Sequence, residues 1–231
     1  MAISFKKNKD ISDDGGGNIF WVTMSDLMLG LAIVFITLFV LAMTGFTQQS
    51  MQQQKVKMDV AKEISQELKK ANIDVHIDKR TGDLEIPSTA LFEVNSFVLT
   101  PAGKTLLSKL APIYINTIFK NQELANEIES ISIQGHTDSQ GFAGVKSVNE
   151  QFVRNMDLSV KRANSVAEYI LQTGYDKKNE AAFRKMIVVE GRSFNNPVII
   201  NGKEDYAKSR RVELKLKVKD WNVANAFGLK T

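Results

Sequence analysis

This 231-residue sequence contains no cysteine, only two histidines and four prolines. Without cysteine the chain cannot form disulfides, thiolate zinc sites, iron–sulfur clusters or a cysteine nucleophile. With only His76 and His136 it cannot assemble a multi-histidine metal site, and no set of residues is typical of hydrolysis, phosphoryl transfer or redox chemistry. The net charge of +4 is too small to indicate nucleic acid as a partner. We therefore expect no enzyme activity, no cofactor or metal and no nucleic-acid binding.

One long hydrophobic run follows a polar tail over residues 1–18. Residues 19–43 contain a single charge, that of Asp26. At about 1.5 Å per residue, a helix of this length exceeds the roughly 30 Å of hydrocarbon in a bilayer. Trp21 near one end suits the membrane interface. A cleavable signal peptide is disfavoured because the run is too long and no A-x-A site follows it. We expect a retained transmembrane helix over residues 19–45.

Asp26 is the most informative residue of this span. A charged Asp at membrane depth costs about 2.5–3.5 kcal/mol on insertion scales, so such residues are paired, neutralised or functional. A carboxyl that gains and loses a proton inside a membrane is the minimal element for coupling to a proton gradient. Small and polar residues share the helix face of this aspartate and indicate a face that packs against other helices. These residues are Thr23, Gly30, Thr37 and Thr44.

A second interpretation of Asp26 stays open at this point. Ser25-Asp26 can instead cap a helix that starts at Leu27. That helix would keep about 17 apolar residues, barely enough to span a bilayer, and would leave the carboxylate among lipid headgroups at little cost.

The rest of the chain predicts a short helix followed by a mixed domain. We expect residues 46–70 to form an amphipathic helix or a linker that leaves the membrane, because Val56, Val60, Ile64 and Leu68 recur at helical spacing. We expect a folded domain over residues 71–220 and a C-terminal tail over 221–231. Helices are expected after Thr100-Pro101, with a kink or an end at Pro112, and over residues 155–174. Strands are expected in a hairpin around KRTG and in SISIQG, MIVVEG and RVELKLKVK. The order predicts an α/β (α+β) sandwich with helices on one face of a mixed sheet.

Polar residues of this domain suggest a binding site for a zwitterion. Asp138 follows a strand in Gly135-His136-Thr137-Asp138, and Arg162 lies on the later helix in N-x-x-L-S-x-x-R-A. The carboxylate can accept from an ammonium, and the guanidinium can bind a carboxylate in bidentate fashion. The alternative is that Asp138, Arg162 and Arg210 form an internal set of salt bridges.

These motifs resemble the peptidoglycan-binding domain of the OmpA family. The resemblance covers residues 85–218 and rests on G-H-T-D, N-x-x-L-S-x-x-R-A, R-R-V-E and F-x-x-x-S-x-x-L-T-P-A-G-K. It implies that Asp138 and Arg162 bind the zwitterionic end of diaminopimelate in the stem peptide. It also implies that Thr137, Asn155 and the pair Arg210-Arg211 line the same groove. Two features depart from the family: the segment 139–156 is longer, and Ser209 stands where asparagine is usual.

The layout of the whole chain resembles MotB-like subunits of ion-driven motors. Within them, W-V-T-M-S-D-L-M-L-G-L-A-I-V-F is most similar to the ZorB family of the Zorya anti-phage defence system. The resemblance implies proton binding by Asp26 and a homodimer inside a ring of five multi-span MotA-like (ZorA-like) partners. It further implies a bacterial inner-membrane protein with residues 1–18 in the cytoplasm and a periplasmic domain bound to peptidoglycan. The alternatives are a flagellar-type stator subunit and a passive membrane-to-wall tether without ion coupling.

Overall fold

The computed structural model describes residues 15–120 and 122–219. The chain divides into two compact units, Met1–Ser50 and Met51–Thr231. Most of the predicted N-terminal tail, residues 1–14, and the predicted C-terminal tail, residues 221–231, lie outside the described residues.

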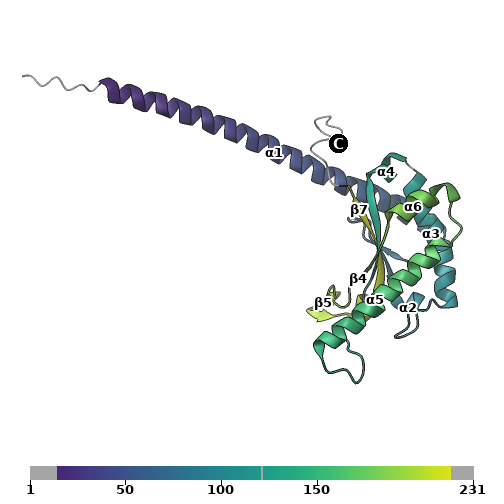
Figure 1. Ribbon diagram of the computed structural model, residues 1–231. Helices are drawn as coiled ribbons and strands as arrows, with labels where there is room; N and C mark the ends of the chain where they lie inside the picture. The colour runs from purple at the N-terminus through teal and green to yellow at the C-terminus, as the bar shows by residue number, and fades with distance from the viewer. Residues whose placement is uncertain (1–14, 121, 220–231) are drawn as a thin grey trace, which may run out of the picture. The chain divides into compact units, whose positions relative to one another are not determined.

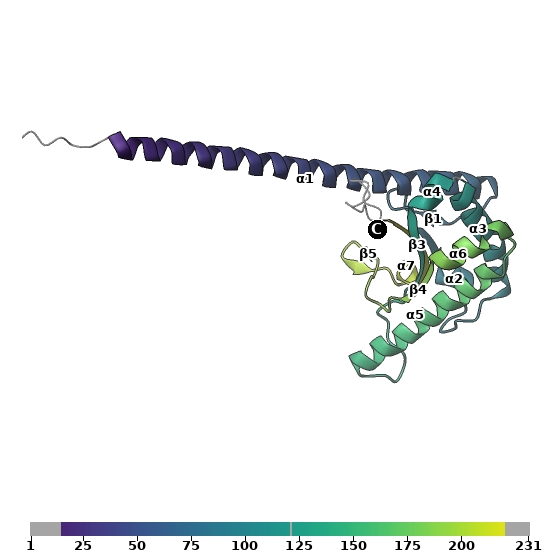
Figure 2. The same cartoon turned by 45° about the horizontal axis from the view of Figure 1, so that its top comes forward.

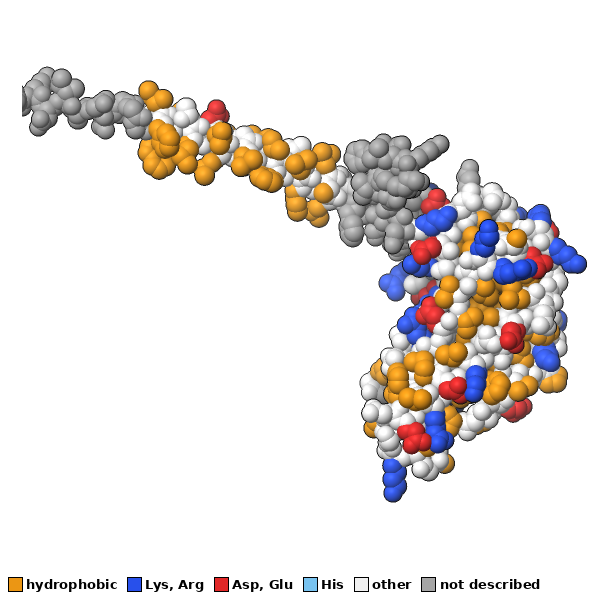
Figure 3. Space-filling view, in the orientation of Figure 1, with side chains coloured by type: hydrophobic (Ala, Val, Ile, Leu, Met, Phe, Trp, Pro, Cys, Tyr) orange, Lys and Arg blue, Asp and Glu red, His pale blue; other side chains and the backbone are white. Residues whose placement is uncertain are grey.

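The described part of the first unit belongs to helix α1, which begins at Gly15 and ends at Lys70. Among the described residues, one segment is long and apolar enough to cross a membrane, by length and composition. It is Ile19–Gly45, with a mean hydropathy of 2.6. Its large hydrophobic side chains are exposed instead of packed in a core (Figure 3). A helix surrounded by lipid has this exposure, whereas the core helix of a soluble domain buries its apolar side chains.

The second unit is built on a mixed sheet with the strand order β1-β2-β7-β3-β4. Strands β3 and β4 are parallel, and the other neighbours are antiparallel. The strands are β1 (His76–Ile77), β2 (Leu84–Pro87), β3 (Ile128–Gly135), β4 (Ile187–Gly191) and β7 (Arg211–Val218), with a separate ribbon of β5 (Ile199–Ile200) and β6 (Lys203–Glu204).

Helices gather on one side of this sheet (Figure 1, Figure 2). They are α2 (Ser88–Leu91), α3 (Pro101–Lys120), α5 (Val148–Leu171) and α6 (Glu180–Met186); α4 (Gln122–Glu127), the 3-10 turn η1 (Lys177–Asn179) and α7 (Tyr206–Ser209) lie in the connections. Helices on one face of a mixed sheet confirm the predicted fold class.

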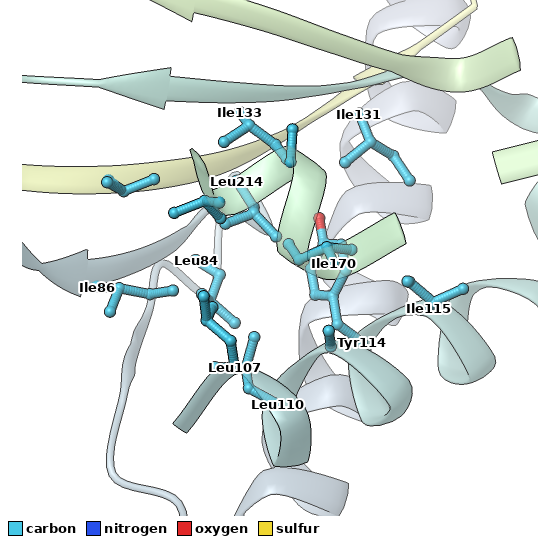
Figure 4. Packing of buried hydrophobic residues seen from close by; sticks show 14 of the residues in the cluster. Leu84, Ile86, Leu107, Leu110, Tyr114, Ile115, Ile131, Ile133, Ile170 and Leu214 are labelled. Atoms are coloured by element: carbon cyan, nitrogen blue, oxygen red, sulfur yellow. The ribbon is translucent and has the colours of Figure 1, made fainter. Parts of the chain in front are cut away.

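The core lies between the helices and the sheet. Along β7, Val212, Leu214 and Leu216 are buried in it, as their alternation with charged residues predicts. Residues from α3 and α5 complete the cluster (Figure 4).

The C-terminal part of α1 also belongs to this core. Val60 and Ile64 are fully buried, and Leu68 is nearly so. The sequence interpretation placed a linker over residues 46–70 and the start of the folded domain near Ala71. In the structure the second unit begins at Met51, because these apolar side chains pack against the domain.

Helix α3 begins where the sequence predicts and ends later. Thr100 caps it, since its Oγ1 accepts from the backbone N–H of Gly103 at 3.0 Å. The sequence predicts a kink or an end at Pro112, but the helix continues to Lys120. Tyr114 and Ile115 beyond the proline are buried, and this tertiary packing compensates for the missing backbone donor.

Candidate functional site

The predicted site residues meet at one end of the sheet, where β3 stops at Gly135. The backbone after Gly135 forms hydrogen bonds to two neighbouring segments of the chain. The N–H of His136 donates to the carbonyl of Arg211 at 2.9 Å, and the N–H of Thr137 donates to the carbonyl of Ser193 at 2.9 Å. Asp138 therefore leaves the sheet from a backbone position fixed by neighbouring segments.

Helix α5 reaches this strand end because glycines permit a close approach. A Cβ atom on Gly135 would lie 2.0 Å from the carbonyl oxygen of Ser159. Gly191, its partner on the parallel strand β4, would bring a Cβ to 2.4 Å from Val160. Only glycine fits both positions, and the contact places the buried face of α5 over the end of β3.

The second unit has a pocket of about 450 Å³ at this place. Five of the six residues that the sequence assigned to ligand binding line it, although they come from three different parts of the chain; Arg211 does not. The five are Thr137, Asp138, Asn155, Arg162 and Arg210. The other lining residues come from α2 with the turn after it and from the loop between β3 and α5, together with Leu158 of α5.

Asp138 and the two arginines of the pocket already have partners within the protein. Asp138 forms an ion pair with Arg210, whose Nη1 also lies 3.3 Å from Oε1 of Gln140. Arg162 donates from Nε to the carbonyl of Ser96 at 2.8 Å and stacks on the ring of Phe92, with Cζ 5.3 Å from the ring centroid. One acid and two arginines that converge on one cavity can bind both ends of a zwitterion.

The environment of the pocket lowers the pKa of Arg162 on α5. Desolvation and then the charge of Arg210 lower the pKa of Arg162, while Asp138 acts in the opposite direction. A guanidinium stays protonated despite such a shift, so the pocket keeps a partly desolvated cation that a carboxylate ligand can pair with.

The two uncharged site residues differ in their bonding. Asn155 donates from Nδ2 to the carbonyl of Gln151 at 3.0 Å. Thr137 is almost fully buried, yet its hydroxyl has no hydrogen-bond partner. Thr137 therefore contributes an unpartnered polar side chain to the pocket lining.

Gln151 is a site residue that the sequence reasoning missed. Its side chain donates from Nε2 to the carbonyls of Phe142 and Val145 at 3.0 and 2.7 Å. Its Oε1 accepts from the N–H of Phe142 at 2.7 Å. These bonds hold the long loop after Asp138 against the pocket, which Phe142 lines. The unusual length of this loop was visible in the sequence, but nothing in the sequence singled out the residue that holds it.

The two arginines at the start of β7, Arg210 just before it and Arg211 as its first residue, have different roles. Arg210 lines the pocket, whereas Arg211 lies outside its lining and donates from Nε to Oε1 of Glu213 at 2.5 Å. Ser209 is also buried away from the pocket, where its hydroxyl accepts from the N–H of Val198 at 3.0 Å. The departure at Ser209 therefore concerns the segment before β5 and leaves the pocket lining unchanged.

Glu213 is a buried carboxylate on the sheet face opposite the hydrophobic core. Burial alone would raise its pKa, but His136, with Nε2 at 3.4 Å from its Oε2, and the cations Lys215 and Arg211 outweigh burial and hold the pKa well below its usual range. Burial lowers the pKa of His136, which is therefore neutral near pH 7. This pair supports the strand ends that carry the pocket.

In the first unit, Asp26 lies inside α1 and does not cap a later helix. The helix begins at Gly15, which excludes the interpretation in which it starts at Leu27. Thr23 and Thr37 of the same stripe donate to backbone carbonyls of their own helix, at 2.9 Å to Phe20 and 2.7 Å to Ile33.

Comparisons with known proteins agree with this architecture. The OmpA family matches residues 91–211. Zorya protein ZorB of Escherichia coli strain Crooks is 29% identical over 214 residues, which cover 86% of this chain and 88% of that protein. ZorB of Escherichia coli O139:H28 strain E24377A is 25% identical over 242 residues, which cover 99% of this chain and 88% of that protein. The crystal structure of a MotB-like protein from Desulfovibrio vulgaris shares the fold, with a TM-score of 0.51 at 21% identity over 74% of this chain and 96% of that chain.

Proposed function

Because this chain belongs to the OmpA family and is a MotB-like protein close to ZorB, we propose that it anchors an ion-driven motor of the bacterial inner membrane to peptidoglycan and conducts its protons. In this proposal the motor serves Zorya-type defence against phage. Residues 1–18 lie in the cytoplasm, residues 19–45 span the membrane once and the second unit lies in the periplasm. Two copies of the chain act within a ring of five MotA-like subunits.

The observation that carries the wall-binding part is the convergence of five of the six predicted residues on one pocket. The pocket holds a carboxylate for an ammonium and two guanidinium groups for a carboxylate, Asp138 with Arg162 and Arg210. Diaminopimelate in the stem peptide presents an ammonium and a carboxylate on one carbon. This match in charge supports a peptidoglycan ligand.

Alanine variants on α5 test the wall-binding part. Arg162→Ala removes a cation of the pocket, whereas Arg154→Ala removes an exposed arginine on the same helix that pairs with Glu150. We expect Arg162→Ala and Asp138→Ala to lose most of the pull-down with purified peptidoglycan and Arg154→Ala to keep it. Equal pull-down by all variants would return Asp138 and Arg162 to a structural role.

The proton-conducting part is supported by the position of Asp26 in an apolar helix whose side chains are exposed. A carboxyl there requires partner helices, because an isolated charge in lipid is costly. The stripe of Thr23, Gly30, Thr37 and Thr44 supplies a face for such partners.

A substitution at Asp26 separates a motor from a passive tether. Asp26→Asn keeps the size and polarity of the side chain but cannot lose a proton, so we expect full membrane assembly and no phage protection. Ser25→Asn is the matched control, because it adds an amide next to Asp26 and leaves the carboxyl in place. Normal protection by Asp26→Asn, measured by plaque counts with the neighbouring genes present, contradicts ion coupling and leaves a tether.

A further inference from the structure

Two buried hydroxyls of the pocket have no hydrogen-bond partner within the protein. Among the described residues, several buried side-chain polar atoms lack a partner, and Ser88 and Thr137 are the two residues with such atoms that line the pocket. Ser88 is 3% exposed, and so is Thr137. Buried polar atoms are nearly always hydrogen-bonded, so two orphan hydroxyls in one cavity require a reason.

Ser88 stands next to the charged groups of the pocket. It directly follows β2, and its N–H donates to the carbonyl of Arg210 at 2.9 Å. Strand β7 begins at the next residue, Arg211, and lies between β2 and β3, so Ser88, Arg210 and Thr137 occupy the same end of three neighbouring strands. Ser88 and Thr137 therefore lie on either side of Arg210, which forms an ion pair with Asp138.

The hydroxyl of Ser88 has no structural task in its own helix. Serine near a helix start usually caps it, but here Pro87 holds the cap position and no side-chain cap bond forms. The backbone of Ser88 is fully used, since its carbonyl also accepts from the N–H of Phe92 at 2.8 Å. Alanine would fill the same space without burying an unsatisfied oxygen.

We propose that Ser88 is a further ligand-binding residue of this pocket, whose hydroxyl bonds to the zwitterion held between Asp138, Arg162 and Arg210. This inference rests on the proposed peptidoglycan-binding function. A hydroxyl can donate to a carboxylate oxygen, so it suits the carboxylate of such a ligand. The ligand then satisfies the oxygen that the free protein leaves without a partner.

The test combines stability and binding in the full-length protein. Ser88→Ala should raise the melting temperature or leave it unchanged, because it removes an unsatisfied buried group. It should weaken binding of a soluble diaminopimelate-containing stem peptide by about threefold to tenfold in calorimetric titration. Opposite effects on stability and binding distinguish a ligand contact from a structural role, which would lower both.

Two further variants control this experiment. Ser88→Thr keeps a hydroxyl and should bind within about twofold of the wild type, whereas equal losses in Ser88→Thr and Ser88→Ala would overturn the role of the hydroxyl. Ser108→Ala removes an exposed serine hydroxyl that bonds to Thr105 and should change neither property.

The choice of peptide separates this inference from the proposed function. A stem peptide with lysine in place of diaminopimelate lacks the side-chain carboxylate, so Ser88→Ala should cause no additional loss with it. A wild-type protein that binds neither peptide refutes the proposed function. Wild-type binding that is lost in Asp138→Ala but unchanged in Ser88→Ala refutes the role of Ser88 alone.

Discussion

Gly135→Ala should damage the fold and the binding pocket together, because this glycine sets the distance between α5 and β3. The added Cβ would lie 2.0 Å from the carbonyl oxygen of Ser159 and 2.8 Å from its carbonyl carbon. Contacts of a Cβ under 3.0 Å are essentially never found, and both groups are backbone, so no side-chain rotation can relieve the contact. The helix must move away from the strand by about 1 Å or the strand end must bend.

The expected loss in the free energy of unfolding follows from the separation of α5 from β3. Overpacking of a core costs about 1–3 kcal/mol when side chains can adjust. Here two backbone segments must separate, so we expect a loss of about 3 kcal/mol in the free energy of unfolding. The same displacement carries Arg162 and Asn155 away from Asp138, which belongs to the strand end. Peptidoglycan binding by Gly135→Ala should therefore be weaker even at urea concentrations below its denaturation midpoint, where the variant is still folded.

Gly174, which follows the C-terminal end of α5, provides the control. It has no atom within 4 Å of an added Cβ. Gly174→Ala should therefore unfold within about 0.5 kcal/mol of the wild type. Urea denaturation followed by circular dichroism measures both variants. Coincident curves for Gly135→Ala and the wild type would refute the argument that close helix–strand contact builds the pocket.

Two other substitutions test the supports of the pocket. Glu213→Gln should lower the free energy of unfolding by about 3 kcal/mol at pH 7, because it leaves Arg211 and Lys215 beside a neutral amide. Burial raises the pKa of Glu213, but the partners of this carboxylate lower it by more. The ionised carboxylate therefore stabilises the fold above about pH 4.5, and this stabilisation is lost as the pH falls further. Urea denaturation at several pH values should show that the variant loses less folding free energy in acid than the wild type. Gln151→Leu removes the side chain that holds the loop after Asp138, so stem-peptide affinity in calorimetric titration should fall about tenfold, while melting changes by only a few degrees.

Much of the fold could be predicted because the second unit has strong local patterns. Alternation along RVELKLKVK predicted β7, and Thr100-Pro101 predicted the start of α3. The start of α5 was placed too late, at residue 155 instead of Val148. Ser147 caps this helix and Glu150 follows three residues later, so a capping signal was present in the sequence and was overlooked.

Other features depend on which elements become neighbours, and the sequence did not contain that information. Alternation showed that Glu213 lies on the face opposite Leu214, but burial of that face follows from the central position of β7 between β2 and β3. The helical spacing of Val60 and Ile64 showed an amphipathic helix without identifying the domain it packs against. The motif residues of the pocket were predictable from the family pattern, whereas Ser88 and Gln151 lie outside that pattern.

The ion pair between Asp138 and Arg210 also determines how strongly one pocket can bind. A ligand ammonium must compete with Arg210 for the carboxylate, and the guanidinium set free can then pair with the ligand carboxylate. Each interaction that the ligand gains with this ion pair replaces one already present, so the net free energy is smaller than the sum of the new contacts. A single pocket is therefore suited to reversible binding of one stem peptide. Under the proposed function, firm attachment to the wall requires several pockets on one polymer, because linked sites increase avidity without new contacts, and the proposed homodimer would supply two.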